Sequence, residues 1–262
     1  MIGVRTSRRF VRRRNVSVFA YSINVLFVDQ SFETPAMELA LDEALLDLRE
    51  EEPGEGFLRF WEPRTPCVIL GRTNDAAREV RLDRCGSLGV PVLRRASGGG
   101  TVVQGPGCLN FPLVLNRSTD PRLANPSGTT ALILGRHAPL LGALTGSTVS
   151  VMGSSDLAIA GRKFSGNAQR RRLRALLFHG SFLLDFDFAL VEDLLPMPSR
   201  EPDYRKGRSH ADFLMNLHLP AGALKDALRV CWEADRDAPA VPLEAAARLA
   251  RDKYATRDWA LK

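Results

Sequence analysis

The feature that most constrains the fold is a run of short β-rich segments between residues 148 and 184, separated by glycine turns and not by helices. The run contains S-D-L-A-I-A-G-R-K-F-S-G-N-A-Q-R and then A-L-L-F-H-G-S-F-L-L. Parallel strands need a long crossover connection, usually a helix, whereas antiparallel strands need only a tight turn. We therefore predict a sheet that is at least partly antiparallel.

Helical periodicity predicts helices on both sides of this run. Thr34 and Pro35 are typical of a helix cap and a first helical residue, and Glu38 and Asp42 share one stripe of the helix that follows. We expect further helices over residues 74–88 (capped by Asn74), 127–144 (capped by Ser127), 188–195, 221–232 and 242–254. We expect further strands over residues 23–29, 57–61, 67–70, 90–93, 101–103 and 109–115. Helices together with a sheet that is at least partly antiparallel indicate an α+β protein.

Residues 90–111 combine two cations and a glycine triplet between two short strands. Three glycines in Ser97-Gly98-Gly99-Gly100 allow backbone N–H groups to approach a ligand closely, as anion-binding nests do. Arg94 and Arg95 could supply charge to a phosphate or a carboxylate. The alternative is a glycine-rich hairpin with surface arginines.

The formal charge of +6 comes from the start of the chain, where six arginines lie between residues 5 and 14. The remainder is formally neutral, which argues against a nucleic-acid partner. We expect residues 1–22 to be a disordered extension or an organellar targeting segment. No later run approaches the roughly 18 apolar residues that span a bilayer. Four cysteines without a C-x-x-C pair argue against disulfides and zinc, and indicate a reducing compartment, cytoplasmic or, with a transit peptide, mitochondrial.

Lys163 is the first of only five lysines among 36 basic residues, and it lies in a strand bracketed by glycines, G-R-K-F-S-G. A compact ammonium on a long stem can reach an oxygen on which negative charge develops. Asp156 lies on the neighbouring part of the same expected hairpin and could bind Mg²⁺, an adenine amine or Lys163 itself. The alternatives are an exposed strand lysine and a turn-forming aspartate.

Two further side chains could take part in chemistry. His179 is a candidate base, although a lone histidine in an apolar strand is more often a hydrogen-bonded core residue. Cys108 is the only thiol within the glycine-rich segment and the only one to test as a nucleophile, although a buried cysteine needs no function.

Several motifs, in the same order along the chain, resemble the lipoate-protein ligase A family, which belongs with the biotin and lipoate ligases. They are M-E-L-A-L-D-E-A-L at 37–45, W-x-x-x-x-P-x-V-x-x-G from Trp61, R-R-A-S-G-G-G-T-V-V at 94–103, L-N-F at 109–111, the segments 155–170 and 179–184, and K-Y-A-T-R-D-W at 253–259.

This resemblance implies a biotin/lipoate ligase catalytic domain over residues 23–262, with a mixed, largely antiparallel sheet and the class II synthetase-like fold. It implies that lipoic acid and ATP, with Mg²⁺, form lipoyl-AMP. The acyl group then passes to a lysine on a lipoyl domain of a 2-oxoacid dehydrogenase or on the glycine-cleavage H protein. By motif, Lys163 would be catalytic, and Asp156 and Gly161 would lie on the nucleotide side, with Asp156 as a possible metal ligand. The acyl-adenylate would contact Arg95, Ser97, Gly98, Gly99, Gly100, Lys163 and His179.

The sequence departs from the family pattern at three places. Val103-Gln104-Gly105 replaces an aromatic-His-Asp run, and Cys108 replaces an asparagine. A full C-terminal accessory domain is not expected, because the chain stops soon after Trp259. A catalytic subunit that needs a separate accessory partner is therefore one alternative.

An octanoyltransferase of the same fold, which takes its acyl group from acyl carrier protein through a cysteine, is the other enzymatic alternative. The cysteine-dependent relatives carry their nucleophile just upstream of the Asp156 position. Val151-Met152-Gly153-Ser154 contains no thiol there, which favours the ligase.

Overall fold

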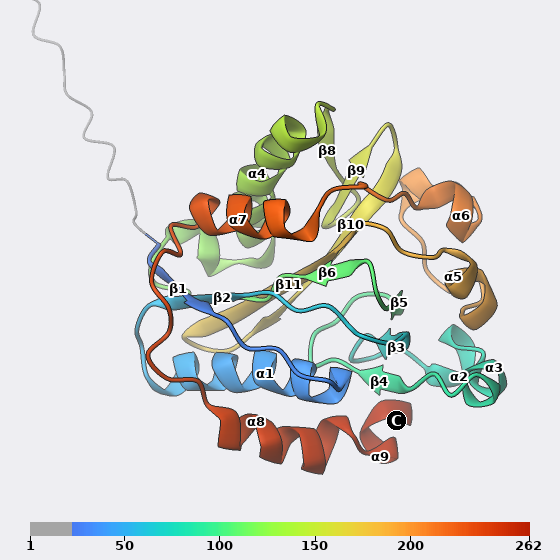
Figure 1. Cartoon of the computed structure of the whole chain (residues 1–262), viewed down its shortest axis with the longest axis horizontal. Coiled ribbons are helices and arrows are strands. Elements are labelled where there is room, and N and C mark those ends of the chain that lie inside the picture. Colours follow the sequence, from blue (N-terminus) through green and yellow to red (C-terminus); the bar gives the residue numbers. More distant parts are fainter. Residues whose placement is uncertain (1–22) are drawn as a thin grey trace, which may run out of the picture.

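A computed structural model describes residues 23–262, and the extension predicted over residues 1–22 lies outside these described residues (Figure 1). Its larger sheet has eight strands in the order β1-β2-β7-β11-β10-β9-β8, with β6 paired to β11. The strands are β1 (Val25–Val28), β2 (Gly56–Arg59), β6 (Cys108–Asn110), β7 (Leu113–Asn116), β8 (Val149–Met152), β9 (Asp156–Ile159), β10 (Arg162–Arg171) and β11 (Ala175–Leu183). Only β1 and β2 pair in parallel. The predicted mixed, largely antiparallel sheet is confirmed.

A second sheet of three strands, in the order β4-β3-β5, holds the glycine-rich segment. It consists of β3 (Cys67–Leu70), β4 (Val92–Arg94) and β5 (Val102–Gln104). Because β4 and β5 lie on opposite sides of β3, the glycine segment is a loop that crosses the end of β3. The hairpin alternative is therefore wrong.

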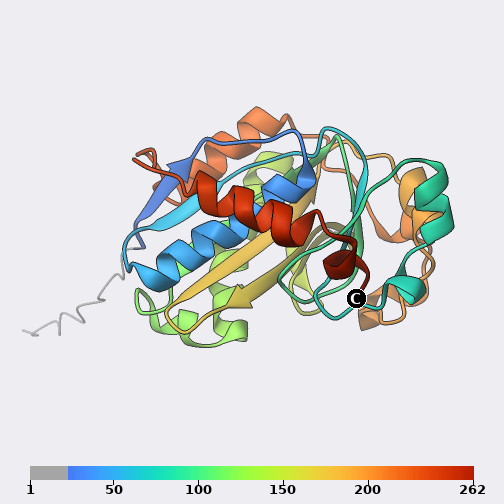
Figure 2. The same cartoon turned by 90° about the horizontal axis from the view of Figure 1, so that it is seen from below.

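Helices cover both faces of the larger sheet (Figure 1). α4 (Pro126–Thr145) and α7 (Ala221–Cys231) cover one face, and α1 (Pro35–Glu51) covers the other. Figure 2 shows α8 (Leu243–Leu249) lying over α1 as an outer layer. No helix within residues 23–262 has the length and hydropathy to cross a membrane.

Alternating residues of the central strands supply two apolar cores. In β7, Leu113 and Leu115 pack with the residues facing α4 and α7, whereas Val114 between them packs with the residues facing α1. β11 does the same, with Leu177 on the side of α1. This two-sided burial explains why these strands read as continuous apolar runs.

One of the three predicted helix caps is confirmed, and two lie at a neighbouring residue. Thr34 caps α1 as predicted, because its side chain accepts a hydrogen bond from the Met37 amide. α4 is capped by Asn125 and not by Ser127, since Pro126 takes the first helical position. Asp75, not Asn74, caps the next predicted helix.

Three predicted elements are each divided in two. The helix expected over 74–88 is α2 (Ala76–Glu79) and α3 (Leu82–Ser87), because the Arg81 amide between them donates to the Leu194 carbonyl. The strand expected over 109–115 breaks into β6 and β7 around Pro112, which has no N–H to donate. The helix expected over 242–254 is α8 followed by a π-helical turn, Ala250–Tyr254.

Short helices complete the described chain. They are η1 (Pro121–Ala124), α5 (Ala189–Leu194), η2 (Asp203–Arg205), α6 (His210–Phe213) and α9 (Arg257–Leu261).

Candidate functional site

A cavity of about 430 Å³ lies where the two sheets meet. Its lining contains six of the predicted site residues, namely Arg95, Gly99, Gly100, Asp156, Lys163 and His179. Ser97, Gly98 and Gly161 do not line it, and Ser97 acts on it through a hydrogen bond described below. The structure thus brings together residues from β9, β10, β11, the glycine loop and position 95, which directly follows β4.

Arg95 organises the glycine loop from within. Its guanidinium donates to the carbonyls of Gly98 (2.7 Å) and Gly100 (2.8 Å), and also to Ile69 on β3. Gly99 has φ of +91°, a conformation that favours glycine, and a Cβ there would meet the Arg95 guanidinium. Burial lowers the pKa of Arg95 to about 10, so the group stays cationic at neutral pH. No carboxylate in the described part of the chain forms an ion pair with it, so this wall of the cavity favours an anion.

Arg94 points away from the cavity and has a structural role. It is fully buried and donates to the carbonyls of Gly71 (2.9 Å) and Asn74 (2.7 Å) in the loop after β3. It also donates to Trp259 (3.0 Å) and Lys262 (2.9 Å) at the end of α9. The hypothesis that Arg94 supplies charge to a ligand is therefore wrong.

Lys163 and Asp156 face each other across the β9–β10 hairpin, with 2.8 Å between Nζ and Oδ1. The register of the hairpin shifts between Lys163 and Ser165, which marks a β-bulge. A Cβ at position 166 would lie 2.8 Å from Nζ, so Gly166 makes room for the ammonium. The predicted closeness of Lys163 and Asp156 is confirmed.

Asp156 does not fit a metal site held by the protein. Its Oδ1 faces Lys163, and its Oδ2 accepts a hydrogen bond from the Tyr204 hydroxyl at 2.8 Å. No group of three or more His, Cys, Asp or Glu side chains suitable for a metal occurs within residues 23–262. The residues from 23 to 262 therefore offer no cluster of three carboxylates to Mg²⁺.

His179 is a hydrogen-bonded, neutral residue. Its Nε2 lies 2.5 Å from Ser97 Oγ, and Arg95 Nε donates to the same oxygen at 3.1 Å. The Ser97 hydroxyl thus has its proton available for His179. Burial, together with the charge of Arg95, lowers the pKa of His179 to about 3. At neutral pH the imidazole is a weak base, which favours a positioning role over general-base catalysis.

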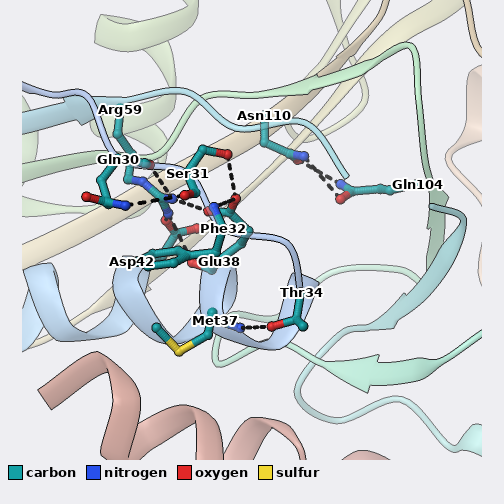
Figure 3. A network of polar contacts seen from close by, with 10 residues as sticks. All are labelled: Gln30, Ser31, Phe32, Thr34, Met37, Glu38, Asp42, Arg59, Gln104 and Asn110. Carbon is teal, nitrogen blue, oxygen red and sulfur yellow. Dashed lines mark hydrogen bonds and ion pairs between the residues drawn. The ribbon is translucent and has the colours of Figure 1, made fainter. Parts of the chain in front are cut away.

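Gln104, where the sequence departs from the family pattern, pairs with Asn110. The two side-chain amides exchange hydrogen bonds of 2.8 and 3.2 Å and both line the cavity (Figure 3). This pairing uses one donor and one acceptor of each amide, so the Gln104 side chain is held in place and keeps its second N–H.

Cys108 is fully buried outside the cavity lining, and burial raises the pKa of its thiol to about 12. A thiol of this kind is not a nucleophile at neutral pH. The fold confirms the structural interpretation of this residue.

Cys108→Ser is expected to leave turnover per folded molecule unchanged. The buried hydroxyl would lack a partner and would lower the free energy of unfolding by about 1–3 kcal/mol, as measured by urea denaturation. Cys231→Ser, at a half-buried position on α7, is the matched control. Loss of activity in a folded Cys108→Ser protein would restore the thiol mechanism.

Three buried charges beside the cavity were not assigned a role from the sequence. Glu38 and Asp42 of α1 both bind the guanidinium of Arg59 on β2, and all three are 0–1% exposed (Figure 3). Asp42 also lines the cavity, and its Oδ2 has no hydrogen-bond partner. The sequence does carry a signal for this cluster. Charged residues stand inside two apolar runs, M-E-L-A-L-D-E-A-L and F-L-R-F-W, and charged residues are rarely buried unless they are paired.

Two carboxylates share one guanidinium in this cluster, and burial raises the pKa of Asp42 to about 7 from 3.8. Arg59 opposes this rise in pKa, and the charge of Glu38 adds to it; the value of about 7 is the net result. Because the pKa is higher in the folded state, this group stabilises the fold at low pH. The free energy of unfolding falls as the pH rises from about 4 to about 7.

We expect Asp42→Asn to have a smaller difference in free energy of unfolding between pH 5 and pH 8 than the unmodified chain. Urea denaturation at the two pH values measures it. An unchanged difference would mean that Asp42 is ionised in the folded state at both pH values.

The site also includes a segment that sequence reasoning left without a role. Residues Pro198, Arg200, Glu201, Pro202 and Arg205 line the cavity. Tyr204 in the same segment holds it against Asp156. Residues 196–208 are polar and basic in sequence, but their contact with the β9–β10 hairpin is not local in sequence.

The fold and the cavity define the class of protein as lipoate-ligase-like. The solved bi-partite lipoate protein ligase of Thermoplasma acidophilum superimposes with a TM-score of 0.74 at 22% identity, covering 92% of this chain and 96% of that chain. A solved lipoate-protein ligase A bound with ATP gives a TM-score of 0.73 at 22% identity, covering 92% and 98%. These likenesses show a shared fold.

The chain belongs to the lipoyl protein ligase A/B catalytic domain family, whose model matches residues 34–219. It is 33% identical over 181 residues to lipoate-protein ligase A subunit 1 of T. acidophilum, covering 64% of this chain and 67% of that protein. It is 30% identical over 220 residues to octanoyltransferase LipM of Carboxydothermus hydrogenoformans, covering 76% and 77%. Alignments with relatives from Aeropyrum pernix and Bacillus subtilis span 58% and 46% of those proteins.

Proposed function

We propose that this chain is the catalytic part of an ATP-dependent lipoate-protein ligase. It activates lipoate to lipoyl-AMP and then passes the lipoyl group to a lysine of a carrier domain. The observation that carries this proposal is a cavity with the Lys163 ammonium and the Arg95 guanidinium in its lining, and with no cysteine among its lining residues. Its volume of about 430 Å³ is within the range of small-molecule sites.

In the first step, a carboxylate oxygen of lipoate attacks the α-phosphorus of ATP, and the bond to pyrophosphate breaks. Negative charge accumulates on the α-phosphate oxygens, and positive groups held in place stabilise such charge. Lys163 supplies an ammonium whose position is fixed by Asp156. The positive charge of Arg95 attracts the carboxylate of lipoate. Gly99 and Gly100 have no side chains, so the ligand can approach their backbone.

In the second step, the ε-amine of the acceptor lysine attacks the acyl carbonyl of lipoyl-AMP. An amide bond forms, the bond to AMP breaks, and the amine loses its proton. The same ammonium stabilises the oxyanion that develops on the carbonyl. Magnesium would arrive with the phosphates of ATP, because residues 23–262 hold no group of three His, Cys, Asp or Glu side chains to bind it.

The chemistry of the described cysteines supports this route over thiol-dependent transfer. Burial raises the pKa of Cys67, Cys85, Cys108 and Cys231. An acyl-thioester mechanism needs a thiolate that can reach the substrate. All four cysteines are free thiols, and a reducing compartment such as the cytoplasm keeps thiols in this state.

The test is to incubate the purified chain with ATP, magnesium, lipoate and an apo lipoyl domain of a 2-oxoacid dehydrogenase. A glycine-cleavage H protein serves as a second acceptor, and octanoyl acyl carrier protein without ATP is the competing donor. We expect ATP-dependent release of pyrophosphate and lipoylation of the acceptor lysine. Acyl transfer from the carrier protein in the absence of ATP would identify an octanoyltransferase instead.

Pyrophosphate release without lipoylation of the acceptor would assign the chain the adenylation step alone. That outcome would indicate a catalytic subunit that needs an accessory partner. The lipoate protein ligase of T. acidophilum is bi-partite, which supports including this outcome.

A further inference from the structure

β8 is an edge strand whose outer side no other strand of residues 23–262 covers. It is the last strand of the larger sheet and pairs with β9 alone among these residues. Residues 145–155, T-G-S-T-V-S-V-M-G-S-S, contain neither a charged residue nor a proline. Val151 is 46% exposed. Natural edge strands usually carry charges, prolines or covering segments, because a bare edge pairs with other chains.

Two other edges in the described chain, those of β1 and β4, are covered. The Phe27 amide of β1 donates to the Arg236 carbonyl at 2.8 Å, and the Ala238 amide donates to the Phe27 carbonyl at 2.7 Å. β4 packs against α9, where Trp259 Nε1 donates to the Arg94 carbonyl at 2.7 Å. The edge of β8 differs from these two, because no backbone hydrogen bond from another described segment reaches it.

The register indicates which amides of β8 point outward. Ala160 and Gly161 form the two-residue turn between β9 and β10, with φ of 49° and 74°. These angles suit a type I′ turn, whose flanking residues form a hydrogen-bonded pair. Alternation along β9 then directs the backbone of Ala158 toward Ser150 of β8. The N–H and C=O groups of Val151 consequently point away from the sheet.

This edge leads directly into the cavity. Met152 at the end of β8 pairs with Asp156, and Ser154 and Ser155 in the connecting turn line the cavity. Neighbouring strands lie about 4.8 Å apart. A strand added outside β8 would thus end beside the cavity mouth, and a lysine just beyond its end could extend into the cavity.

The segment beside the cavity mouth carries positive side chains that form no ion pair with residues 23–262. A Cβ at Gly153 would lie 3.3 Å from Pro202, so the β8–β9 turn adjoins the segment 200–208. Arg200 and Lys206 in that segment are exposed and have no ion-pair partner within residues 23–262. An acidic partner would be attracted to this side of the molecule.

We propose that β8 is the docking edge for the acceptor protein, an inference that rests on the proposed function. An exposed strand of an acidic carrier domain pairs with Val149–Met152, and the target lysine follows the end of that strand. Main-chain pairing supplies affinity, as in other β-augmentation complexes, and the position of the lysine along the strand supplies selectivity.

Val151→Pro is the test variant and Val151→Ala is its matched control. Proline removes one outward N–H, which an edge strand tolerates, whereas alanine shortens the side chain and keeps the N–H. We expect the dissociation constant for an apo lipoyl domain, measured by calorimetry, to rise about tenfold in Val151→Pro, the equivalent of about 1.4 kcal/mol. Val151→Ala is expected to bind like the unmodified chain.

Adenylation is measured separately, by trapping lipoyl-AMP with hydroxylamine as the hydroxamate, which needs no acceptor protein. We expect equal hydroxamate formation in all three proteins. Absence of hydroxamate from the unmodified chain would overturn the proposed function, whereas equal carrier affinity in Val151→Pro would overturn the docking edge alone.

Hydrogen exchange of the unmodified chain covers the case in which Val151→Pro fails to fold. Addition of the apo lipoyl domain is expected to protect the Val149 and Val151 amides, and unchanged exchange there would overturn the proposal. Protection that depends on the concentration of this chain alone would assign the edge to self-association and would also overturn it.

Discussion

Replacing Lys163 by alanine is expected to lower the turnover of lipoyl-AMP formation by about 10²- to 10³-fold, the effect of removing one preorganised contact to a developing charge. The ammonium is only partly exposed and is held 2.8 Å from Asp156 in the cavity lining. The change also leaves Asp156 without its cation, which disfavours a second anion at the site. The rate of hydroxamate formation with saturating ATP and lipoate measures the effect.

Lys225→Ala on α7 is the matched control, because this lysine is remote from the residues that line the cavity. Its turnover should equal that of the unmodified chain. Lys163→Arg keeps the charge and changes its shape, so it is expected to recover only part of the lost rate. Near-normal turnover by a folded Lys163→Ala protein would show that Lys163 is structural.

Replacing Arg59 by methionine is expected to lower the free energy of unfolding by about 3–5 kcal/mol, since one partner of a buried ion cluster is lost. Arg59 is 0% exposed and binds both Glu38 and Asp42. It also donates to the Glu38 and Gln30 carbonyls (Figure 3). Without it, two carboxylates would remain buried without a cation. Urea denaturation at pH 8 measures the loss.

Arg64→Met is the control for this experiment, because Arg64 and Glu33 form an ion pair 3.3 Å apart with both side chains exposed. Such pairs contribute about 0–1 kcal/mol. A triple variant with Glu38→Leu, Asp42→Leu and Arg59→Met should recover most of the stability that Arg59→Met loses, because no unpaired charge remains. A loss below about 1 kcal/mol in Arg59→Met would show that water reaches the cluster.

Local features of the fold could be predicted from the sequence. The β9–β10 hairpin follows from the Ala160-Gly161 turn and the flanking β-rich residues, so Asp156 and Lys163 were correctly placed together. The start of α1 follows from Thr34 and Pro35. These features depend on residues close in sequence, where turn and capping preferences act directly.

Features that depend on distant segments could not be predicted. Arg94 and Arg95 are adjacent in sequence, and alternation along a strand sends neighbours to opposite sides. Only the position of α9 decides that Arg94 meets the Trp259 carbonyl while Arg95 faces the cavity. Likewise, Arg59 meets α1 only after the β1–α1–β2 unit has formed.

The covered edge of β1 has a consequence for synthesis of the protein on the ribosome. β1 is among the first described segments to be made, yet the segment that seals its edge, Arg236 to Ala238, is made near the end. Pairings between segments far apart in sequence form slowly, and unpaired strand edges on incomplete chains are sites of aggregation. Nascent chains that carry β1 without residues 236–238 should therefore depend on chaperones until the last helices have left the ribosome.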